Sequence, residues 1–314
     1  MTTLLSNPLR PALLAAARSP KLQATVTRLR ATRSLVDRFV AGESEPAAVS
    51  AVDALLASGR FVSVDYLGED TTDRSQARAT VDAYLSLIQR FSTRDADATA
   101  LEISLKLSAL GQGIDRSLAL ENARTICTAA AAAGVWVTVD AEDHTTTDST
   151  LSIVRELRAD FPDLGTVLQA YLRRTEADCH DLSGPRSRIR LCKGAYNEPS
   201  SVAFQSAREV SDSYLRCLQV LMNGRGYPMV ASHDPEMIEA ADRLASAAGR
   251  SSEEFEFQML YGIRDPEQRR LVGAGRNVRV YVPYGSQWYG YFMRRLAERP
   301  ANLMFFARSV LSRT

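Results

Sequence analysis

The segment 189–196, with the sequence IRLCKGAY, holds two cations three positions apart at the end of a strand-like run. Arg190 and Lys193 would compensate the charge of a phosphate or a reduced cofactor, and the small residues Gly194 and Ala195 let backbone amides approach an anionic or planar ligand. The alternative is a strand end with solvated charges and a turn glycine. We favour the ligand-binding interpretation because Lys193 is one of only three lysines among 38 basic residues.

Four residues near the carboxyl end, Tyr291, Arg294, Arg295 and Glu298, recur at positions i, i+3, i+4 and i+7 and therefore share one face of a helix. Two adjacent guanidinium groups suit a carboxylate, which arginine binds through paired hydrogen bonds. Taken alone, the segment is more typical of an exposed helix with Arg–Glu pairs. The carboxylate site therefore depends on what the rest of the chain places beside it.

Carboxylates also follow a β-branched run, at Asp140 and Glu142. A carboxylate at the end of a strand is either catalytic or a counter-ion. Lys106 and Arg190, which belong to other strand-like runs, need counter-ions in either case. His233 is open to three interpretations: a general base, a cofactor contact, or a histidine with satisfied hydrogen bonds outside the reacting centre.

The elements that position these residues follow a regular order. Residues 1–60 show only helical spacing of apolar positions, and from residue 61 strand-like and helical segments alternate. Eight strand-then-helix units predict a (β/α)8 barrel rather than an open sheet, so we expect a helical segment at 1–60 packed on a barrel at 61–314. The strand candidates are 61–66, 101–107, 135–140, 165–171, 187–192, 227–232, 255–260 and 278–283, and the helical segments between and after them are 74–92, 117–133, 147–160, 173–180, 201–223, 235–248, 265–273 and 286–312.

Nearly every strand candidate ends in a polar or ionisable cluster. In a barrel these positions converge on the carboxyl-terminal mouth, where the active sites of this fold lie. We therefore expect a site assembled from most of the strands. The residues are Asp65, Lys106 and Ser108, Asp140 and Glu142, Gln169 and Tyr171, Arg190 and Lys193, Ser232 with His233 and Asp234, Glu256 and Gln258, and Tyr281.

Composition excludes several classes of protein. The chain has 314 residues, 45% apolar and 24% charged, which is ordinary for a globular protein and excludes disordered, collagen-like and coiled-coil proteins. A net charge of +1 gives no global field that would attract nucleic acid. The cysteines show no C-x-x-C pair and only three histidines are present, so we expect free thiols in a reducing cytoplasm and no metal site.

Familiar targeting and nucleotide motifs are missing from the sequence. The first 21 residues contain prolines and arginines that interrupt every apolar stretch, so we expect neither a signal peptide nor a membrane span. No G-x-G-x-x-G follows a strand, and the chain has neither a phosphate-binding G-x-x-x-x-G-K-[ST] loop nor a G-x-S-x-G elbow. A dinucleotide would have to be held by the barrel mouth.

Several strings together resemble the proline dehydrogenase family, specifically its short monofunctional bacterial members. The resemblance spans about residues 61–302 and rests on LKLSALG, VDAEDH, LQAYLRR, RLCKGAY, SHD, FEFQMLYG, YVPYG and the Y-x-x-RR-x-x-E pattern from Tyr291 to Glu298. It implies a distorted (β/α)8 TIM-like barrel with additional N-terminal helices and non-covalent FAD at the strand ends. It also implies oxidation of L-proline to Δ1-pyrroline-5-carboxylate, the first step of proline catabolism to glutamate, by hydride transfer from proline C5 to FAD N5.

The resemblance assigns a role to each matching position. Lys106, Arg294 and Arg295 correspond to the clamp for the substrate carboxylate, and Asp140 and Arg190 to the catalytic pair, with Arg190 beside the flavin N5. Glu298 and Glu142 would support these groups from outside. The positions that match FAD contacts are Ala141, Gln169, Arg190, Lys193, Gly194, Ala195, Ser232 and His233. The residues that would line the substrate ring or its cation clamp are Tyr196, Leu260, Tyr281 and Tyr291.

The chain departs from the family pattern at a few of these positions. Cys192 stands where Val is frequent, Ser232 where Thr is common, Asp234 where Asn is common, and Ala207 where a basic residue often occurs. We expect these departures to alter FAD phosphate and ribose contacts rather than the reaction.

Two other functions compete with this one. The first is a Schiff-base lyase or aldolase that uses Lys106 as its nucleophilic amine, since inward lysines on barrel strands act in that way. The second is a non-catalytic regulator that binds proline or flavin. For the dehydrogenase, the resemblance implies quinone or another electron acceptor. It leaves open a peripheral contact with the inner face of the cell membrane and a downstream aldehyde dehydrogenase. The cysteines and the net charge predict a cytoplasmic protein with no nucleic-acid partner.

Overall fold

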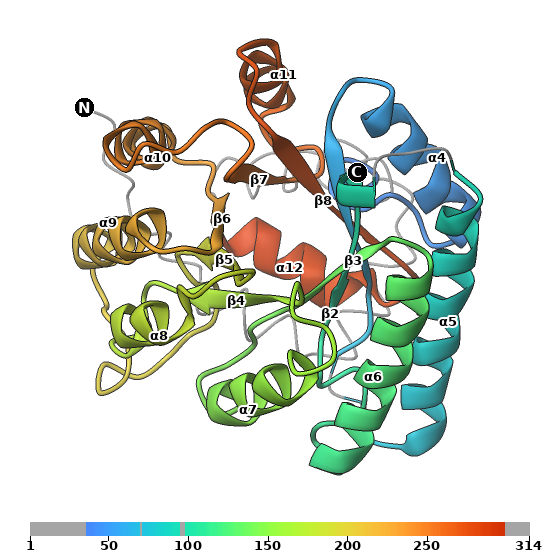
Figure 1. Cartoon of the computed structure of the whole chain (residues 1–314). Helices are drawn as coiled ribbons and strands as arrows, with labels where there is room; N and C mark the ends of the chain where they lie inside the picture. Colours follow the sequence, from blue (N-terminus) through green and yellow to red (C-terminus); the bar gives the residue numbers. More distant parts are fainter. Residues whose placement is uncertain (1–35, 70, 95–97, 299–314) are drawn as a thin grey trace, which may run out of the picture.

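The computed structural model describes residues 36–69, 71–94 and 98–298. Eight parallel strands in sequential order close into a barrel, with β8 pairing back to β1 (Figure 1). This confirms the predicted (β/α)8 fold. The strands are β1 (Phe61–Tyr66), β2 (Leu101–Leu105), β3 (Trp136–Val139), β4 (Gly165–Gln169), β5 (Arg188–Cys192), β6 (Tyr227–Ala231), β7 (Glu256–Leu260) and β8 (Val278–Tyr284).

Helices follow the strands and surround most of the barrel. They are α5 (Arg74–Ser92), α6 (Arg116–Ala132), α7 (Thr147–Leu157), α8 (Thr175–Leu182), α9 (Ala207–Asn223), α10 (Pro235–Ala247), α11 (Asp265–Gly273) and α12 (Trp288–Glu298), with the short 3₁₀ turn η1 (Ala98–Ala100) before β2. Of the predicted N-terminal helical segment 1–60, the described part contains α4 (Glu45–Leu56), and residues 1–35 lie outside the described chain.

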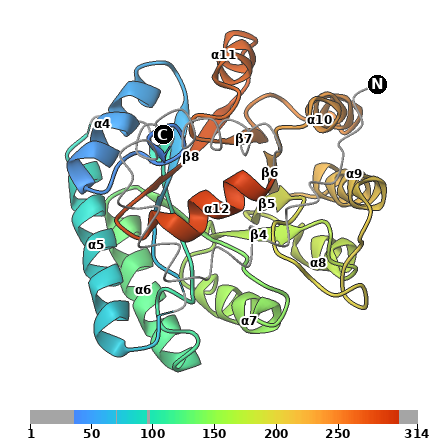
Figure 2. The same ribbon diagram turned by 180° about the vertical axis from the view of Figure 1, so that it is seen from behind.

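The last helix departs from the regular barrel pattern. α12 lies across the middle of the barrel instead of in the outer ring (Figure 1, Figure 2), and its apolar side packs on Val36, Phe39 and Val40. α4 instead covers the outside of β8 and β1. As a result, the paired arginines of α12 are carried to the barrel opening.

One predicted helix begins later than expected. The spacing predicted helix from residue 201, but α9 begins at Ala207. Ser206 caps it, because its hydroxyl accepts from the backbone N–H of Glu209 at 3.2 Å while the Glu209 carboxylate accepts from the N–H of Ser206 at 3.1 Å. Before this helix, Ala203 forms an isolated antiparallel bridge with Leu172. Residues 193–206 are therefore a long β5–α9 loop.

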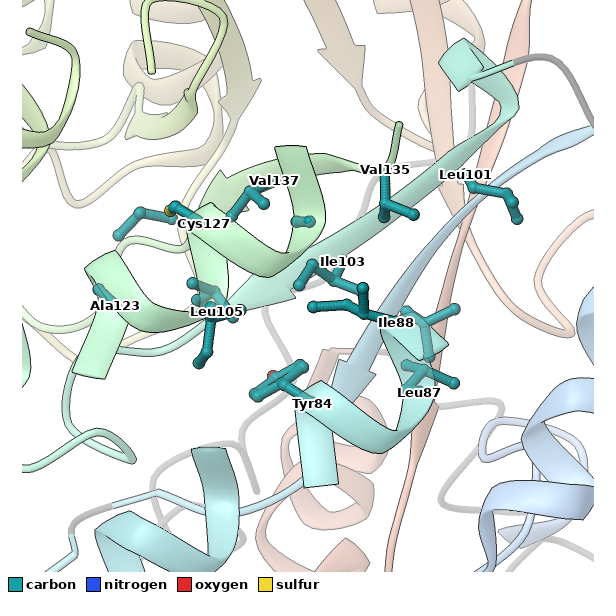
Figure 3. Close-up of a cluster of buried hydrophobic side chains, with 14 of the residues drawn as sticks. Tyr84, Leu87, Ile88, Leu101, Ile103, Leu105, Ala123, Cys127, Val135 and Val137 are labelled. Atoms are coloured by element: carbon teal, nitrogen blue, oxygen red, sulfur yellow. The ribbon is translucent and has the colours of Figure 1, made fainter. Parts of the chain in front are cut away.

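Alternation along the strands separates two environments. Outward-facing apolar residues pack against the helices; Figure 3 shows this where β2 and β3 meet α5 and α6, with Ile103, Leu105, Val137, Tyr84 and Cys127 among the residues drawn. This aliphatic layer is the main core of the molecule on that side.

The inside of the barrel is ionic instead. Glu102, fully buried on β2, accepts hydrogen bonds from Arg188 at 2.5 Å and Arg190 at 2.7 Å, and Arg279 binds Glu256 at 2.8 Å. Buried charges persist only when they are paired, so this lattice of ions fixes the direction in which each arginine points. Arg190 is thereby aimed toward the mouth.

Candidate active site

A cavity of about 750 Å³ opens at the carboxyl-terminal mouth of the barrel. All the residues predicted to serve in catalysis, substrate binding or cofactor binding line it. They are Lys106, Asp140, Ala141, Gln169, Arg190, Lys193, Gly194, Ala195, Tyr196, Ser232, His233, Leu260, Tyr281, Tyr291, Arg294 and Arg295.

Asp140 joins four side chains of the cavity floor. Its carboxylate accepts hydrogen bonds from the hydroxyls of Ser104 and Tyr281, each at 2.7 Å, from Arg190 at 2.6 Å and from Lys106 Nζ at 3.2 Å. Burial alone would raise the pKa of Asp140, but the charges of Lys106 and Arg190 outweigh burial and hold that pKa below its ordinary value. Asp140 is therefore an anion at neutral pH.

Lys106 lies between two carboxylates. Its Nζ donates to Asp65 Oδ2 at 2.6 Å and to the hydroxyl of Tyr281 at 3.0 Å, besides Asp140. Burial lowers the pKa of Lys106, yet the anionic neighbours raise it well above the ordinary lysine value. The ammonium is thus stabilised, which disfavours its use as a nucleophilic amine, because a Schiff-base lysine must lose its proton.

Asp65 was recognised in the sequence only as part of a strand-end cluster. Its side chain is fully buried beside Lys106, and burial raises the pKa of Asp65 to about 6 despite the opposing effect of that ammonium. Its role is to complete the charge balance of the floor.

Arg190 is held by the protein on every side. Its Nε donates to Gln258 at 2.5 Å; Nη1 donates to Ser104 and Asp140; Nη2 donates to Glu102 and to Ser63 at 3.1 Å. These five bonds equal the number of N–H groups on a guanidinium. Arg190 therefore offers the cavity a fixed positive charge in a preset orientation.

The two arginines predicted to clamp the substrate carboxylate have different surroundings. Arg294 binds Glu69 through two parallel hydrogen bonds, of 2.8 and 2.5 Å, and the Arg295 guanidinium lies 5.1 Å from the centre of the Tyr291 ring. Sequence reasoning missed Glu69, which lies in the loop after β1. It expected Glu298 to support the arginines; the Glu298 side chain lies outside the described part of the chain.

Another cation of the cavity lining, Lys193, directly follows β5. Lys193 Nζ donates to Ser211 on α9 at 2.9 Å and to Asp234, the residue that caps α10, at 2.8 Å. Gly194 beside it has φ +110°, and a Cβ there would lie 2.2 Å from Tyr171 Cδ1, so no larger residue fits. Residues 193–196 thus form a cradle in the cavity wall.

The structure narrows the interpretation of His233. Its Nε2 accepts a hydrogen bond from the backbone N–H of Leu260 at 2.9 Å, so the ring proton sits on Nδ1. Its carbonyl accepts from Arg264 at 2.6 Å, and this arginine lines the cavity although no sequence pattern indicated it. A cofactor contact agrees with this geometry better than a general base.

Glu142 lies behind the cavity wall and does not line it. Its carboxylate accepts from the hydroxyl of Ser108 and from the Ser108 backbone N–H at 3.0 Å, and its carbonyl accepts from Gln169 Nε2 at 2.8 Å. Burial raises the pKa of Glu142 to about 7. The backbone of Glu142 thus helps to orient Gln169, and the supporting role predicted for its side chain stays a prediction.

The fold and this mouth are those of a barrel enzyme with a cation-rich pocket, and comparison with known proteins identifies its family. A family model described as proline dehydrogenase matches residues 48–308. Proline dehydrogenase 1 of Bacillus subtilis (strain 168) is 38% identical over 282 residues, covering 90% of this chain and 92% of the relative. Proline dehydrogenase of Deinococcus radiodurans is 40% identical over 285 residues, covering 88% and 90%. The chain belongs to the proline dehydrogenase family, as the motifs indicated.

Solved structures support the fold. Proline utilization A from Bdellovibrio bacteriovorus, inactivated by N-propargylglycine, superposes with a TM-score of 0.78 at 22% identity, and a mutant of the Bradyrhizobium japonicum protein with 0.72 at 24%. Both cover 92% of this chain, which spans only 36% and 33% of those longer chains.

The family is FAD-dependent, which confirms the predicted cofactor, and the pocket fits such a group. Gly194 lines the cavity at a point where a Cβ would collide with the Tyr171 ring, so only glycine lets the chain lie there, and Lys193 and Arg264 supply cations in the same cavity lining. The cavity volume lies within the range of small-molecule and cofactor sites. No helix in the described ranges is both long and apolar enough to cross a membrane.

Proposed function

We propose that this chain oxidises L-proline to Δ1-pyrroline-5-carboxylate with FAD as its cofactor. The observation that carries the proposal is that one cavity joins the paired arginines of α12 to the Lys106–Asp140–Arg190 cluster, in a chain of the proline dehydrogenase family. The first group suits a carboxylate and the second a reaction in which negative charge develops.

Substrate binding uses the arginines. Arg294 and Arg295 bind the carboxylate of proline, and Tyr196, Leu260 and Tyr281 bound the space for its ring. Binding energy at the carboxylate then fixes the position of C5, the carbon that reacts.

The protonation of the substrate nitrogen matters, because only the neutral amine has a lone pair that assists departure of hydride from C5. In the floor, the carboxylates of Asp65 and Asp140 balance the charges of Lys106 and Arg190. We expect the positive charge of the clamp as a whole, to which Arg294 and Arg295 contribute, to favour the neutral amine.

Cofactor binding uses other residues of the same cavity lining. Lys193, Gly194 and Ala195 would hold FAD together with Ala141, Gln169, Ser232 and His233, and Arg190 would face its reactive edge. Bound FAD supplies the two-electron acceptor for the hydride that leaves proline C5. Arg190 contributes a fixed positive charge where negative charge accumulates.

The electrons and the product must leave. We propose quinone as the electron acceptor, reached from the cytoplasm by peripheral contact with the inner face of the cell membrane, and an aldehyde dehydrogenase as the next enzyme. The support is the resemblance to the family together with the chemistry of the product, which hydrolyses to an aldehyde.

A product assay tests the function. The protein is purified, supplemented with FAD and incubated with L-proline and an artificial electron acceptor. Mass spectrometry should find a product that is lighter than proline by two hydrogen atoms. A lyase using Lys106 would instead give a borohydride-trapped adduct on that lysine, and a regulator would bind proline without product.

A further inference from the structure

The β5–α9 loop, residues 193–206, carries Lys193, Gly194, Ala195 and Tyr196 into the cavity wall, although it contains no helix or extended strand. An irregular loop has no regular backbone hydrogen bonds, so side-chain contacts must hold it in one shape. A loop without such contacts would have to be ordered by the ligand, and the lost conformational entropy would weaken binding. The contacts that hold this loop are therefore relevant to cofactor binding.

Glu198 supplies the most concentrated set of these contacts. Its side chain is only 3% exposed, although it belongs to a surface loop. One carboxylate oxygen accepts the backbone N–H of His144 at 2.9 Å and the hydroxyl of Tyr171 at 3.2 Å, and the other pairs with His144 Nδ1. Glu198 thus ties its own loop to the loops that follow β3 and β4.

Tyr171 transmits this constraint to the cavity. Its ring lies against Gly194, at a point where an added Cβ would be 2.2 Å away. Its backbone N–H donates to the carbonyl of Lys193 at 2.9 Å, and its carbonyl accepts from Phe204 N–H at 2.8 Å. Tyr171 is therefore bonded to both ends of the β5–α9 loop, and Glu198 holds its hydroxyl.

Glu198 itself stays out of the cavity. It is absent from the lining, whereas the four residues 193–196 that its contacts stabilise all belong to it. Its effect on a ligand must therefore pass through Tyr171 and the loop backbone.

We propose that Glu198 is a positioning residue for FAD: by binding Tyr171 and His144 it holds Tyr171 against Gly194 and keeps residues 193–196 in the shape that receives the cofactor. This inference rests on the proposed function, since it concerns the same cavity. It adds a residue that the sequence motifs did not single out.

The test measures FAD binding rather than turnover. Flavin-free protein is titrated with FAD, and quenching of flavin fluorescence gives the dissociation constant. Glu198→Ala should raise that constant about tenfold or more, which corresponds to about 1.4 kcal/mol. Glu198→Gln keeps acceptor and shape and should restore most of the affinity.

A matched control separates positioning from general stability. Asp178 is another buried carboxylate, on α8, and binds Arg174 through two hydrogen bonds without touching the loop. Asp178→Asn should reduce the melting temperature but leave the FAD dissociation constant unchanged. Hydrogen exchange should quicken at residues 193–206 in Glu198→Ala and not in the control.

A second substitution, Tyr171→Phe, removes the hydroxyl that Glu198 binds and keeps the ring. It should raise the FAD dissociation constant. The double variant with Glu198→Ala should bind FAD little more weakly than Glu198→Ala alone, since both substitutions remove the Glu198–Tyr171 hydrogen bond. If Glu198→Ala fails to fold, the Tyr171→Phe titration decides the question.

Wild-type affinity in Glu198→Ala or, where that variant does not fold, in Tyr171→Phe would overturn the inference, as would an equal loss in Asp178→Asn. Failure of the wild type itself to bind FAD would overturn the proposed function instead, and this inference with it.

Discussion

Arg294 meets Glu69 in a two-pronged contact, with Nη1 donating to Oε2 at 2.8 Å and Nη2 to Oε1 at 2.5 Å. Burial alone would raise the pKa of Glu69, but the charges of Arg294 and Lys106 and the hydrogen bonds from Arg294 together outweigh burial and lower that pKa, so both groups are charged. Arg294 is thus already oriented by Glu69. If Arg294 binds the carboxylate of proline, as we propose, it does so while paired with Glu69, and Arg295 lies over the ring of Tyr291.

Truncation of the clamp is the first prediction. Arg295→Met or Arg294→Met should raise the apparent KM for proline roughly 10- to 100-fold, because a charge-assisted bond contributes about 1.5–3 kcal/mol and 1.4 kcal/mol is tenfold. Arg294→Met also leaves the carboxylate of Glu69 without the arginine that binds it.

Prolinol, which has the ring but no carboxylate, is the matched control substrate for the clamp. The wild type should use it poorly, and either arginine variant should lose little more. Equal losses for proline and prolinol would mean that the arginines support the fold or the cofactor rather than the carboxylate. FAD content should stay near that of the wild type.

The second prediction concerns the fixed charge of Arg190. Arg190→Met should lower the reduction potential of bound FAD and slow hydride transfer, because a buried cation that favours added negative charge is removed. Arg190→Lys keeps the charge without the fork of donors and should retain more of the potential. Redox titration with reference dyes measures both, and an unchanged potential in Arg190→Met would rule out this role.

The third prediction separates two of the lysines. Lys193→Ala should be isolated depleted of FAD, because Lys193 lies at the cradle beside Asp234 and Ser211. Lys106→Ala should retain its yellow colour yet require much more proline, because Lys106 belongs to the charged floor. Absorbance spectra of the purified proteins and KM values report the two properties, and exchanged phenotypes would show that the two roles are assigned to the wrong lysines.

The fourth prediction concerns stability and pH. Burial raises the pKa of Glu142 from the ordinary 4.5 to about 7. Between these values the folded protein keeps a proton that the unfolded chain releases, so the free energy of unfolding should fall as pH rises from 4.5 through 7.

Glu142→Gln cannot titrate and should lack this part of the slope. The difference between variant and wild type should reach on the order of 3 kcal/mol across the window, at about 1.4 kcal/mol per pKa unit. Urea unfolding at pH values on either side of the window measures it. Parallel stability curves would show that Glu142 does not titrate there.

The strands and the cavity lining could be predicted from the sequence, because the alternation of residues shows the strands and the barrel topology determines which strand ends lie together. Period-two alternation marks a strand, and parallel strands in a barrel bring their polar carboxyl ends to one mouth. Asp140, Arg190 and Tyr281 therefore meet although they are far apart in sequence. Residue roles came from the family resemblance, and they remain predictions that the variants above test.

The groups that sequence reasoning missed share a physical cause. Glu69 and Arg264 lie in loops, where no periodicity indicates direction, and Glu69 matters only because α12 crosses the mouth. Glu102 on β2 belonged to no motif, and it is buried among arginines inside the barrel. The helical spacing after residue 201 was likewise misleading, since the capping box at Ser206 starts the helix later.

Anaerobic addition of L-proline to the FAD-loaded protein tests the central claim most directly. The account predicts that the visible absorbance of the oxidised flavin is lost, with one Δ1-pyrroline-5-carboxylate formed per flavin, and that the absorbance returns when an electron acceptor is admitted. A flavin spectrum that proline leaves unchanged, in protein that binds both FAD and proline, would contradict it.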